Sequence, residues 1–147
     1  MEKTVITCDV ECYPNYFLVT LFRVSDGATV YIDMHNDSIE LHALEKLRFM
    51  LSRYTVVTYN GNYYDLPLVY MFLSGCNNQT LKEYSDRIIH EKIKPWEIER
   101  IYKDFSIDTI DLIDLCPLQS TLKIYGGRLH TKTMQDLPLP PDVIIPQ

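Results

Sequence analysis

The sequence predicts an α/β domain in which helices flank a mixed β-sheet. Three β-rich stretches follow one another at the start of the chain, an order typical of an antiparallel meander. Helical and strand patterns then alternate, which favours parallel strands joined by helical crossovers. With 147 residues, 46% of them hydrophobic, the chain has the size and composition of a single domain with an ordinary core.

β-branched and aromatic residues dominate the three opening stretches, at residues 4–13, 15–24 and 29–35. Pro14 and Asn15 favour a turn after the first stretch, and Asp26-Gly27 is a strong hairpin signal after the second. The three stretches are therefore expected to form an antiparallel meander.

A helix is expected next, at residues 40–54. Apolar side chains recur there at helical spacing: Leu41, Leu44, Leu47, Leu51 and Tyr54. Asp37 or Ser38 is the expected N-cap. One amphipathic helix therefore follows the meander.

The short apolar run at residues 55–59 has the character of an interior parallel strand. The segment NGNYYD, residues 60–65, leads from the end of this strand into a second helix at residues 65–75, which Gly75 closes. This loop therefore lies at a strand end, where sites of α/β sheets are commonly found.

Residues 79–103 have the pattern of two further helices separated by Lys94-Pro95. Residues 106–115 have the β-branched content of another strand. These elements continue the alternation that favours parallel crossovers.

A short helix is expected within residues 117–127, stopped by Gly126 and Gly127. The domain is expected to span residues 1–137. Residues 138–147 form a proline-rich tail that either runs over the surface or hangs free, because it has neither a helix nor a strand pattern.

Charge and composition narrow the functional classes. Fourteen basic and twenty acidic residues give a net charge of −6, which excludes a basic coat over the whole protein but not a local nucleic-acid groove. We expect a cytoplasmic protein with no membrane partner, because no apolar run approaches the roughly 18 residues of a membrane span. The cysteines show no metal-site spacing and are expected to be reduced core residues: Cys8, Cys12, Cys76 and Cys116.

Asp9 and Glu11 stand two residues apart inside the first predicted strand. Side chains alternate between the two faces of a strand, so both carboxylates lie on one face. Placing like charges together is costly unless a metal ion or an arginine compensates them. The alternative is an edge strand with solvated acids, which the apolar neighbours of the pair disfavour.

Asp65 offers a third carboxylate, at the end of the pattern Asn-x-x-x-aromatic-Asp. A carboxylate delivered from a second element toward a strand-borne pair suits the binding of two hard cations such as Mg²⁺ or Mn²⁺. The simpler alternatives are a helix-dipole role for Asp65 and an ordinary turn at Asn60-Gly61. The dipole role is compatible with metal binding.

Three stretches of the chain resemble the proofreading 3′-5′ exonuclease domains of DNA polymerases, most closely those of bacteriophages: DVECYPNYF, YNGNYYDLPLV and LKIYGGRLHTKTMQDLPLPPD. These domains belong to the DEDD exonuclease superfamily and have a ribonuclease H-like fold. The resemblance covers nearly the whole chain. It implies removal of nucleotides from a single-stranded DNA 3′ end, with two metal ions that activate water and stabilise the leaving oxygen.

The resemblance also assigns roles to single residues. Asp9 matches the carboxylate that binds both metal ions, Glu11 matches its neighbour, and Asp65 matches the aspartate of the second motif. Asn60 and Tyr64 match flanking positions, where an amide positions the strand and an aromatic ring stacks on a base.

The chain departs from the family at the fourth carboxylate. The family carries it in a Tyr-x-x-x-Asp or His-x-x-x-x-Asp motif, and neither spacing occurs in this sequence. His130 and Asp136 are one residue too far apart, and Asp142 is the last acidic residue. We therefore expect little or no activity from the isolated chain.

Three explanations for the missing carboxylate remain open. A second polypeptide supplies it, as in a split phage polymerase, or the chain is a truncated or degenerate exonuclease that binds metal and DNA with little turnover. In the third, Asp136 or one of three aspartates, more simply explained as solvated or capping, takes its place: Asp108, Asp111 and Asp114.

A competing function belongs to a different class. The chain would keep the nuclease fold as an inactive module that binds DNA or a partner protein, with the apolar tail as a docking segment. RNA is also open as a substrate, because no residue pattern here selects DNA over RNA.

Overall fold

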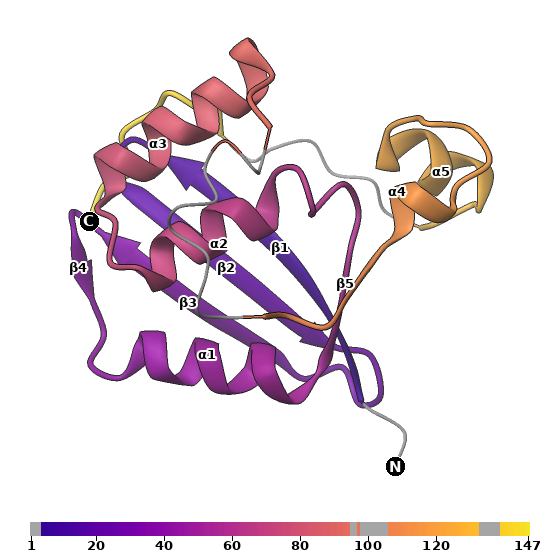
Figure 1. The fold of residues 1–147 in the computed structure, drawn as a ribbon, viewed down its shortest axis with the longest axis horizontal. Coiled ribbons are helices and arrows are strands. Elements are labelled where there is room, and N and C mark those ends of the chain that lie inside the picture. Colours follow the sequence, from indigo (N-terminus) through magenta and orange to yellow (C-terminus); the bar gives the residue numbers. More distant parts are fainter. Residues whose placement is uncertain (1–3, 95–96, 98–105, 133–138) are drawn as a thin grey trace.

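The computed structural model of the chain describes residues 4–94, 97, 106–132 and 139–147. Six strands form one mixed sheet in the order β4-β3-β2-β1-β5-β6 (Figure 1). Their bounds are β1 Val5–Tyr13, β2 Tyr16–Arg23, β3 Thr29–His35, β4 Ser38–Ile39, β5 Thr55–Thr58 and β6 Thr109–Asp111.

The predicted meander is confirmed. β1 pairs antiparallel with β2, and β2 pairs antiparallel with β3. The hairpin after β2 turns at Gly27, whose φ of 75° is a left-handed conformation that glycine adopts without strain. β5 and β6 extend the sheet as parallel strands on the other side of β1. The α/β class and the mixed sheet are therefore as expected, in an arrangement consistent with a ribonuclease H-like fold.

Three helices lie over one face of the sheet (Figure 1): α1 Ala43–Arg53, α2 Asp65–Leu73 and α3 Asn78–Asp86. Two short helices, α4 Leu112–Leu115 and α5 Leu122–Arg128, stand to the side of the sheet beyond β6. The core between the sheet and α1 to α3 includes Phe17, Val19, Leu47, Leu51, Leu68 and Phe72. No helix in the described residues has the length and hydrophobicity to cross a bilayer.

The alternation predicted for β1 is present. The face in contact with the helices consists of Ile6, Cys8, Val10 and Cys12, all buried. Asp9 is exposed and Glu11 is half-buried on the opposite face. β1 lies between β2 and β5 in the sheet, but β5 pairs only with Val5–Thr7, so the acidic pair lies past the parallel pairing.

The cysteine prediction holds for the two cysteines of β1. Cys8 and Cys12 are buried free thiols, and burial raises the pKa of both. Cys76 and Cys116 are also free but only half-buried. The two cysteine side chains of β1 therefore serve as small apolar core residues.

The helix predicted after the meander is present as α1, but its predicted N-cap is wrong. Ser38 lies in β4, and Asp37 bonds to the start of α3 instead. Its Oδ1 accepts the Asn78 N–H (2.7 Å), and its own N–H donates to Asn78 Oδ1 (2.8 Å). The α1 helix begins after His42, whose φ is 66° and whose side chain makes no capping bond. Leu41 therefore precedes the helix and is exposed rather than buried.

The first of the two helices predicted within residues 79–103 is α3. Its N-cap is Asn77, whose side chain accepts the Thr80 N–H (2.9 Å). The helix continues into a π-helical turn, η1 Arg87–Glu91, and ends at Lys92 in a left-handed conformation with φ of 56°. The second predicted helix falls on residues 95–103, of which the structure describes only Glu97.

The strand predicted at residues 106–115 is shorter than expected. β6 stops at Asp111, whose side chain accepts the Ile113 N–H (3.3 Å) and caps α4. The later helix prediction is also corrected at its end. α5 continues through Gly126 and Gly127 instead of stopping at them.

Residues 139–147, called the C-terminal strap below, contain no helix or strand, as predicted for the tail. The strap is attached to the body of the protein. The Asn15 side chain donates to the Ile145 carbonyl (2.9 Å) and accepts the Ile145 N–H (2.8 Å). Lys82 Nζ lies 2.9 Å from an Asp142 carboxylate oxygen. The surface path is therefore confirmed for residues 139–147, and the alternative of a free tail is wrong.

Candidate functional site

The carboxylates of β1 lie where the strand extends past its parallel neighbour. β5 pairs with β1 only over Val5–Thr7. Val10, between Asp9 and Glu11, therefore lies beyond the paired segment and is open to a partner from another element.

Asp65 is that partner. It is the first residue of α2, only 7% exposed, and its Oδ1 accepts the Val10 N–H at 3.0 Å. The N-terminus of α2 thus delivers a third carboxylate to the segment of β1 between Asp9 and Glu11. The structure therefore places Asp65 beside the segment of β1 that carries Asp9 and Glu11.

The three acids form an uncompensated cluster of negative charge. Burial raises the pKa of Asp65 to about 7, the charge of Asp9 adds to this effect, and the Val10 N–H opposes it. Burial also raises the pKa of Asp9, with a further contribution from the charge of Glu11. No ion pair between residues that the structure describes neutralises any of the three.

The donor set suits a hard divalent cation, because all three residues offer carboxylate oxygens. A bound cation would also relieve the repulsion that raises the pKa of Asp65. Within the described ranges, no three His, Cys, Asp or Glu side chains are already close enough together to hold a metal ion. Asp9, Glu11 and Asp65 match Mg²⁺ or Mn²⁺ by charge and ligand type. To bind the ion, the three carboxylates would have to move closer together.

The loop between β5 and α2 is held by Asp111, at the end of β6. Asp111 is 5% exposed, and its carboxylate accepts the backbone N–H of Asn60 (2.6 Å) and of Asn62 (2.9 Å). These bonds stabilise the loop although Asn60 has a left-handed φ of 63°. The capping alternative for Asp111 is therefore correct, whereas the solvated alternative is wrong.

Gly61 in this loop packs directly on β5. A Cβ atom added at Gly61 would lie 2.3 Å from Thr58 Cβ, far inside contact distance. The sequence Asn60-Gly61 is therefore more than an ordinary turn, because a side chain at the second position would force the loop away from the sheet.

A cleft of about 800 Å³ opens beside Glu11, the one residue of the three acids that lines it. Its walls come from the end of β1, the loop before α2, the residues around η1 and the strap. Residues that line it include Glu11, Tyr13, Asn60, Tyr63, Tyr64 and Lys94. Tyr13 donates a hydrogen bond to Glu11 Oε2 (3.2 Å), so the hydroxyl orients that carboxylate.

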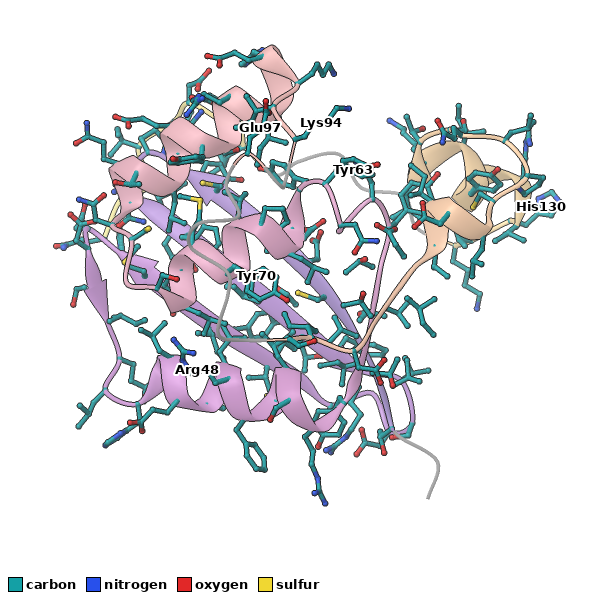
Figure 2. The ribbon with its side chains drawn as sticks, in the orientation of Figure 1. Arg48, Tyr63, Tyr70, Lys94, Glu97 and His130 are labelled. Atoms are coloured by element: carbon teal, nitrogen blue, oxygen red, sulfur yellow. The ribbon has the colours of Figure 1, made fainter. Side chains whose placement is uncertain are left out.

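The structure separates the roles of two adjacent tyrosines. Tyr64 lies half-buried in the cleft wall, its hydroxyl bonds Ser85 Oγ (2.8 Å), and burial raises its pKa to about 12. Tyr63 is 42% exposed, and Lys94 Nζ lies 5.7 Å from the centre of its ring. Figure 2 shows Tyr63 and Lys94 close together. Tyr63 therefore offers more ring surface to a ligand than Tyr64, the residue that sequence reasoning selected.

Among the described aspartates that were considered as a fourth carboxylate, none lies beside the other three acids as a free ligand. Asp108 and Asp114 are exposed, and Asp142 pairs with Lys82. The charge of Asp111 adds, after burial and Asp9, to the raised pKa of Asp65, but loop amides occupy its carboxylate. Asp136 lies outside the described residues.

Sequence reasoning named Asp111 as a capping residue without placing it at the loop before α2, and it assigned no role in the site to Tyr63 or Lys94. Asp111 had a usable signal, since a β-branched run that ends in Asp before a helical segment is an N-cap pattern. Tyr63 and Lys94 had none, because their proximity depends on how the chain turns after η1.

Comparisons with known proteins add no relationship. No family model, no curated protein and no solved structure matches this chain. The function of this chain is therefore inferred from its residues and from the geometry described above.

Proposed function

We propose that this chain is the metal-dependent 3′-5′ exonuclease domain, or part of one, of a phage-type DNA polymerase. It would hydrolyse the terminal phosphodiester bond of single-stranded DNA, in the cytoplasm of the host. The resemblance of its motifs to such domains supports this assignment.

One observation carries the proposal. The N–H of Val10, which lies between Asp9 and Glu11, donates to Asp65 Oδ1. This bond brings the carboxylate of the second motif to the strand segment that carries the first motif, and Glu11 of that segment lines a cleft large enough for nucleotides. Asp9 is in repulsion with Asp65 and with Glu11, and such repulsion destabilises a fold unless a cation compensates it.

Each residue has a definable task in this reaction. Asp9, Glu11 and Asp65 would hold two Mg²⁺ or Mn²⁺ ions, which supply Lewis acidity to a water nucleophile and a leaving oxygen when bound. Tyr13 would orient Glu11 through its hydrogen bond. Asn60 and Tyr64, both in the cleft wall, would position the end of the strand.

The missing fourth carboxylate sets the expected rate. Without it, one metal site loses a ligand and transition-state interactions are lost. We therefore expect slow turnover from the isolated chain and faster turnover when a second polypeptide supplies the carboxylate.

The test is digestion of 5′-labelled single-stranded DNA by the purified chain in Mn²⁺. Parallel reactions contain the Asp9→Asn variant or EDTA, and Asp114→Asn serves as a matched control because Asp114 is an exposed acid outside the cluster. The expected result is a slow 3′-to-5′ ladder that requires both Mn²⁺ and Asp9. A ladder that persists unchanged in Asp9→Asn would contradict the proposal.

The absence of any ladder would favour the second candidate, an inactive nuclease-fold module that binds DNA or a partner protein. The observation in its favour is that no described group of side chains is already arranged around a metal position. The strap weakens one version of it, because its Ile145 backbone is already engaged by Asn15. Oligonucleotide binding that survives in EDTA would support the DNA-binding version.

A further inference from the structure

The wall of the cleft that carries Tyr63 combines an exposed aromatic ring with two lysines. Tyr63 is 42% exposed, whereas Asn62 and Tyr64 on either side of it are half-buried. Lys92 and Lys94 line the same cleft, and Lys94 Nζ lies 5.7 Å from the Tyr63 ring centre. An exposed ring beside two cations offers a surface for a flat, anionic ligand.

The backbone explains why the lysines face the cleft. Lys92 ends η1 in the left-handed region, with φ of 56°, so the chain turns there. The Lys94 N–H then donates to a Glu97 carboxylate oxygen (2.6 Å). The two lysines thus follow a turn at the end of η1.

The cleft presents an aromatic ring together with cations. Tyr63, Lys92 and Lys94 all line it, and Lys94 Nζ lies beside the Tyr63 ring. A single-stranded nucleic acid matches this combination, because its bases stack on aromatic rings and its phosphates attract lysines. A purely acidic peptide would use the lysines but not the ring.

We infer that Tyr63, Lys92 and Lys94 form a subsite for single-stranded nucleic acid, in which a nucleobase stacks on Tyr63 and the lysines contact adjacent phosphates. The inference rests on the proposed function for the orientation of the strand, whose end would lie toward Glu11. It differs from the role suggested by sequence, because Tyr63 rather than Tyr64 supplies the stacking face.

The test measures binding without catalysis. A 5′-fluorescein single-stranded oligonucleotide is titrated with the protein in EDTA and followed by anisotropy, with ribo- and deoxyribo-oligonucleotides compared. Tyr63→Ala is expected to weaken binding by roughly 5- to 150-fold, the loss typical of one stacked base. Tyr63→Phe should bind like the wild type, because the ring face remains.

Matched controls separate stacking from general damage. Tyr31→Ala removes another exposed tyrosine, 66% exposed on β3 and outside the cleft lining, and should leave binding unchanged. An oligonucleotide with abasic sites should bind Tyr63→Ala and wild type equally. Each of Lys92→Gln and Lys94→Gln should reduce the slope of log affinity against log salt by about 0.7.

The outcomes distinguish this inference from the proposed function. Lost binding in Tyr63→Ala without any nuclease ladder in Mn²⁺ would sustain the subsite and refute the exonuclease. A clear ladder with unchanged binding and unchanged rate in Tyr63→Ala would refute the subsite alone. The subsite is also refuted if the wild type binds no oligonucleotide, or if abasic strands lose as much affinity as intact ones.

Discussion

Asp65 is a buried acid whose nearest charged neighbour is another acid. Its raised pKa means that the folded protein holds a proton which the unfolded chain has released, over the interval between about pH 4 and pH 7. The unfolded state is therefore favoured increasingly as pH rises through that interval in the absence of metal.

Asp65→Asn should consequently be more stable than the wild type at pH 8 in EDTA. Asparagine keeps an oxygen for the Val10 N–H and carries no charge. The gain is on the order of 4 kcal/mol at most, because one pKa unit corresponds to about 1.4 kcal/mol, and it should disappear near pH 4. Urea unfolding at pH 4, 6 and 8 measures it, and a difference that does not change with pH would contradict the assignment.

Gly61 tests the packing of the loop that carries the site. In Gly61→Ala the new Cβ would meet Thr58 Cβ, and because both carbons are attached to backbone, neither can rotate away. We expect a loss of about 1–3 kcal/mol in the free energy of unfolding, as for other overpacked positions.

Gly75→Asn is the matched control for Gly61→Ala. A Cβ at Gly75 meets nothing within 4 Å, and asparagine tolerates its left-handed φ of 86°. Its unfolding free energy should therefore change little. Equal stability of Gly61→Ala and the wild type would show that the loop can move away from β5 without cost.

The acids of this site were accessible from sequence, because a strand fixes which side chains share a face and a helix start fixes where Asp65 lies. Which of the two rings, Tyr63 or Tyr64, is exposed could not be predicted from sequence. Adjacent loop residues follow no fixed period, so only the hydrogen bond to Ser85 shows which ring is held in the wall.

At the scale of elements, the strap is attached at the turn after β1, next to His35, whose Nε2 lies 3.1 Å from the Ile145 carbonyl, and at Lys82. The Asn15 side chain forms two hydrogen bonds with the Ile145 backbone, a pairing that resembles one step of a β-ladder. Asn15→Ala should therefore release the strap while the sheet stays intact. Two lost hydrogen bonds predict a decrease of about 1–3 kcal/mol in local stability.

Hydrogen exchange of the backbone amides measures this release. The Ile145 amide should exchange much faster in Asn15→Ala, whereas the amides of β1 and β2 should be unchanged. Asp142→Asn provides the comparison, since it removes only the ion pair to Lys82, and Lys82 keeps Asp86 as a second partner. Unchanged exchange at Ile145 would mean that other contacts hold the strap.

Element types were more predictable than element ends. Apolar periodicity identified α1, because it reflects burial against the sheet. The N-cap of α1 was wrong because Asp37 bonds to Asn78, 41 residues away along the chain, which no local pattern reveals. The predicted end of α5 was wrong. Thr121 caps the first turn of this helix, and its backbone stays helical through both glycines, which are costly in a helix but do not by themselves end one.

For the whole molecule, binding of a divalent ion should be visible as stabilisation. An ion that binds only the folded state at one hundred times its dissociation constant adds about 2.7 kcal/mol, which raises Tm by roughly 5–11 °C for a chain of this size. We expect Mn²⁺ or Mg²⁺ to raise the Tm of the wild type and of Asp114→Asn.

The same ions should have a much smaller effect on Asp9→Asn and on Asp65→Asn. Differential scanning fluorimetry across an ion titration gives the comparison, with Ca²⁺ as a further divalent ion. An equal rise in Tm for all variants would mean that the ion binds elsewhere on this acidic protein.

The sheet as a whole was predictable because each parallel strand was preceded by a helical segment long enough to cross over it. The attachment of the strap to the first turn was not. A proline-rich segment has no period, so its partner is decided by backbone hydrogen bonds that form only after the body has folded.

The strap also imposes an order on synthesis. The chain emerges from the ribosome N-terminus first, and the sheet can be complete once β6 has emerged, at Asp111. Ile145 follows about 34 residues later, which takes roughly 2–7 s at about 5–20 residues per second. During that interval the turn at Asn15 is folded with its side-chain amide unpaired by the strap, so a nascent chain stalled there would exhibit the completed sheet and an open cleft edge.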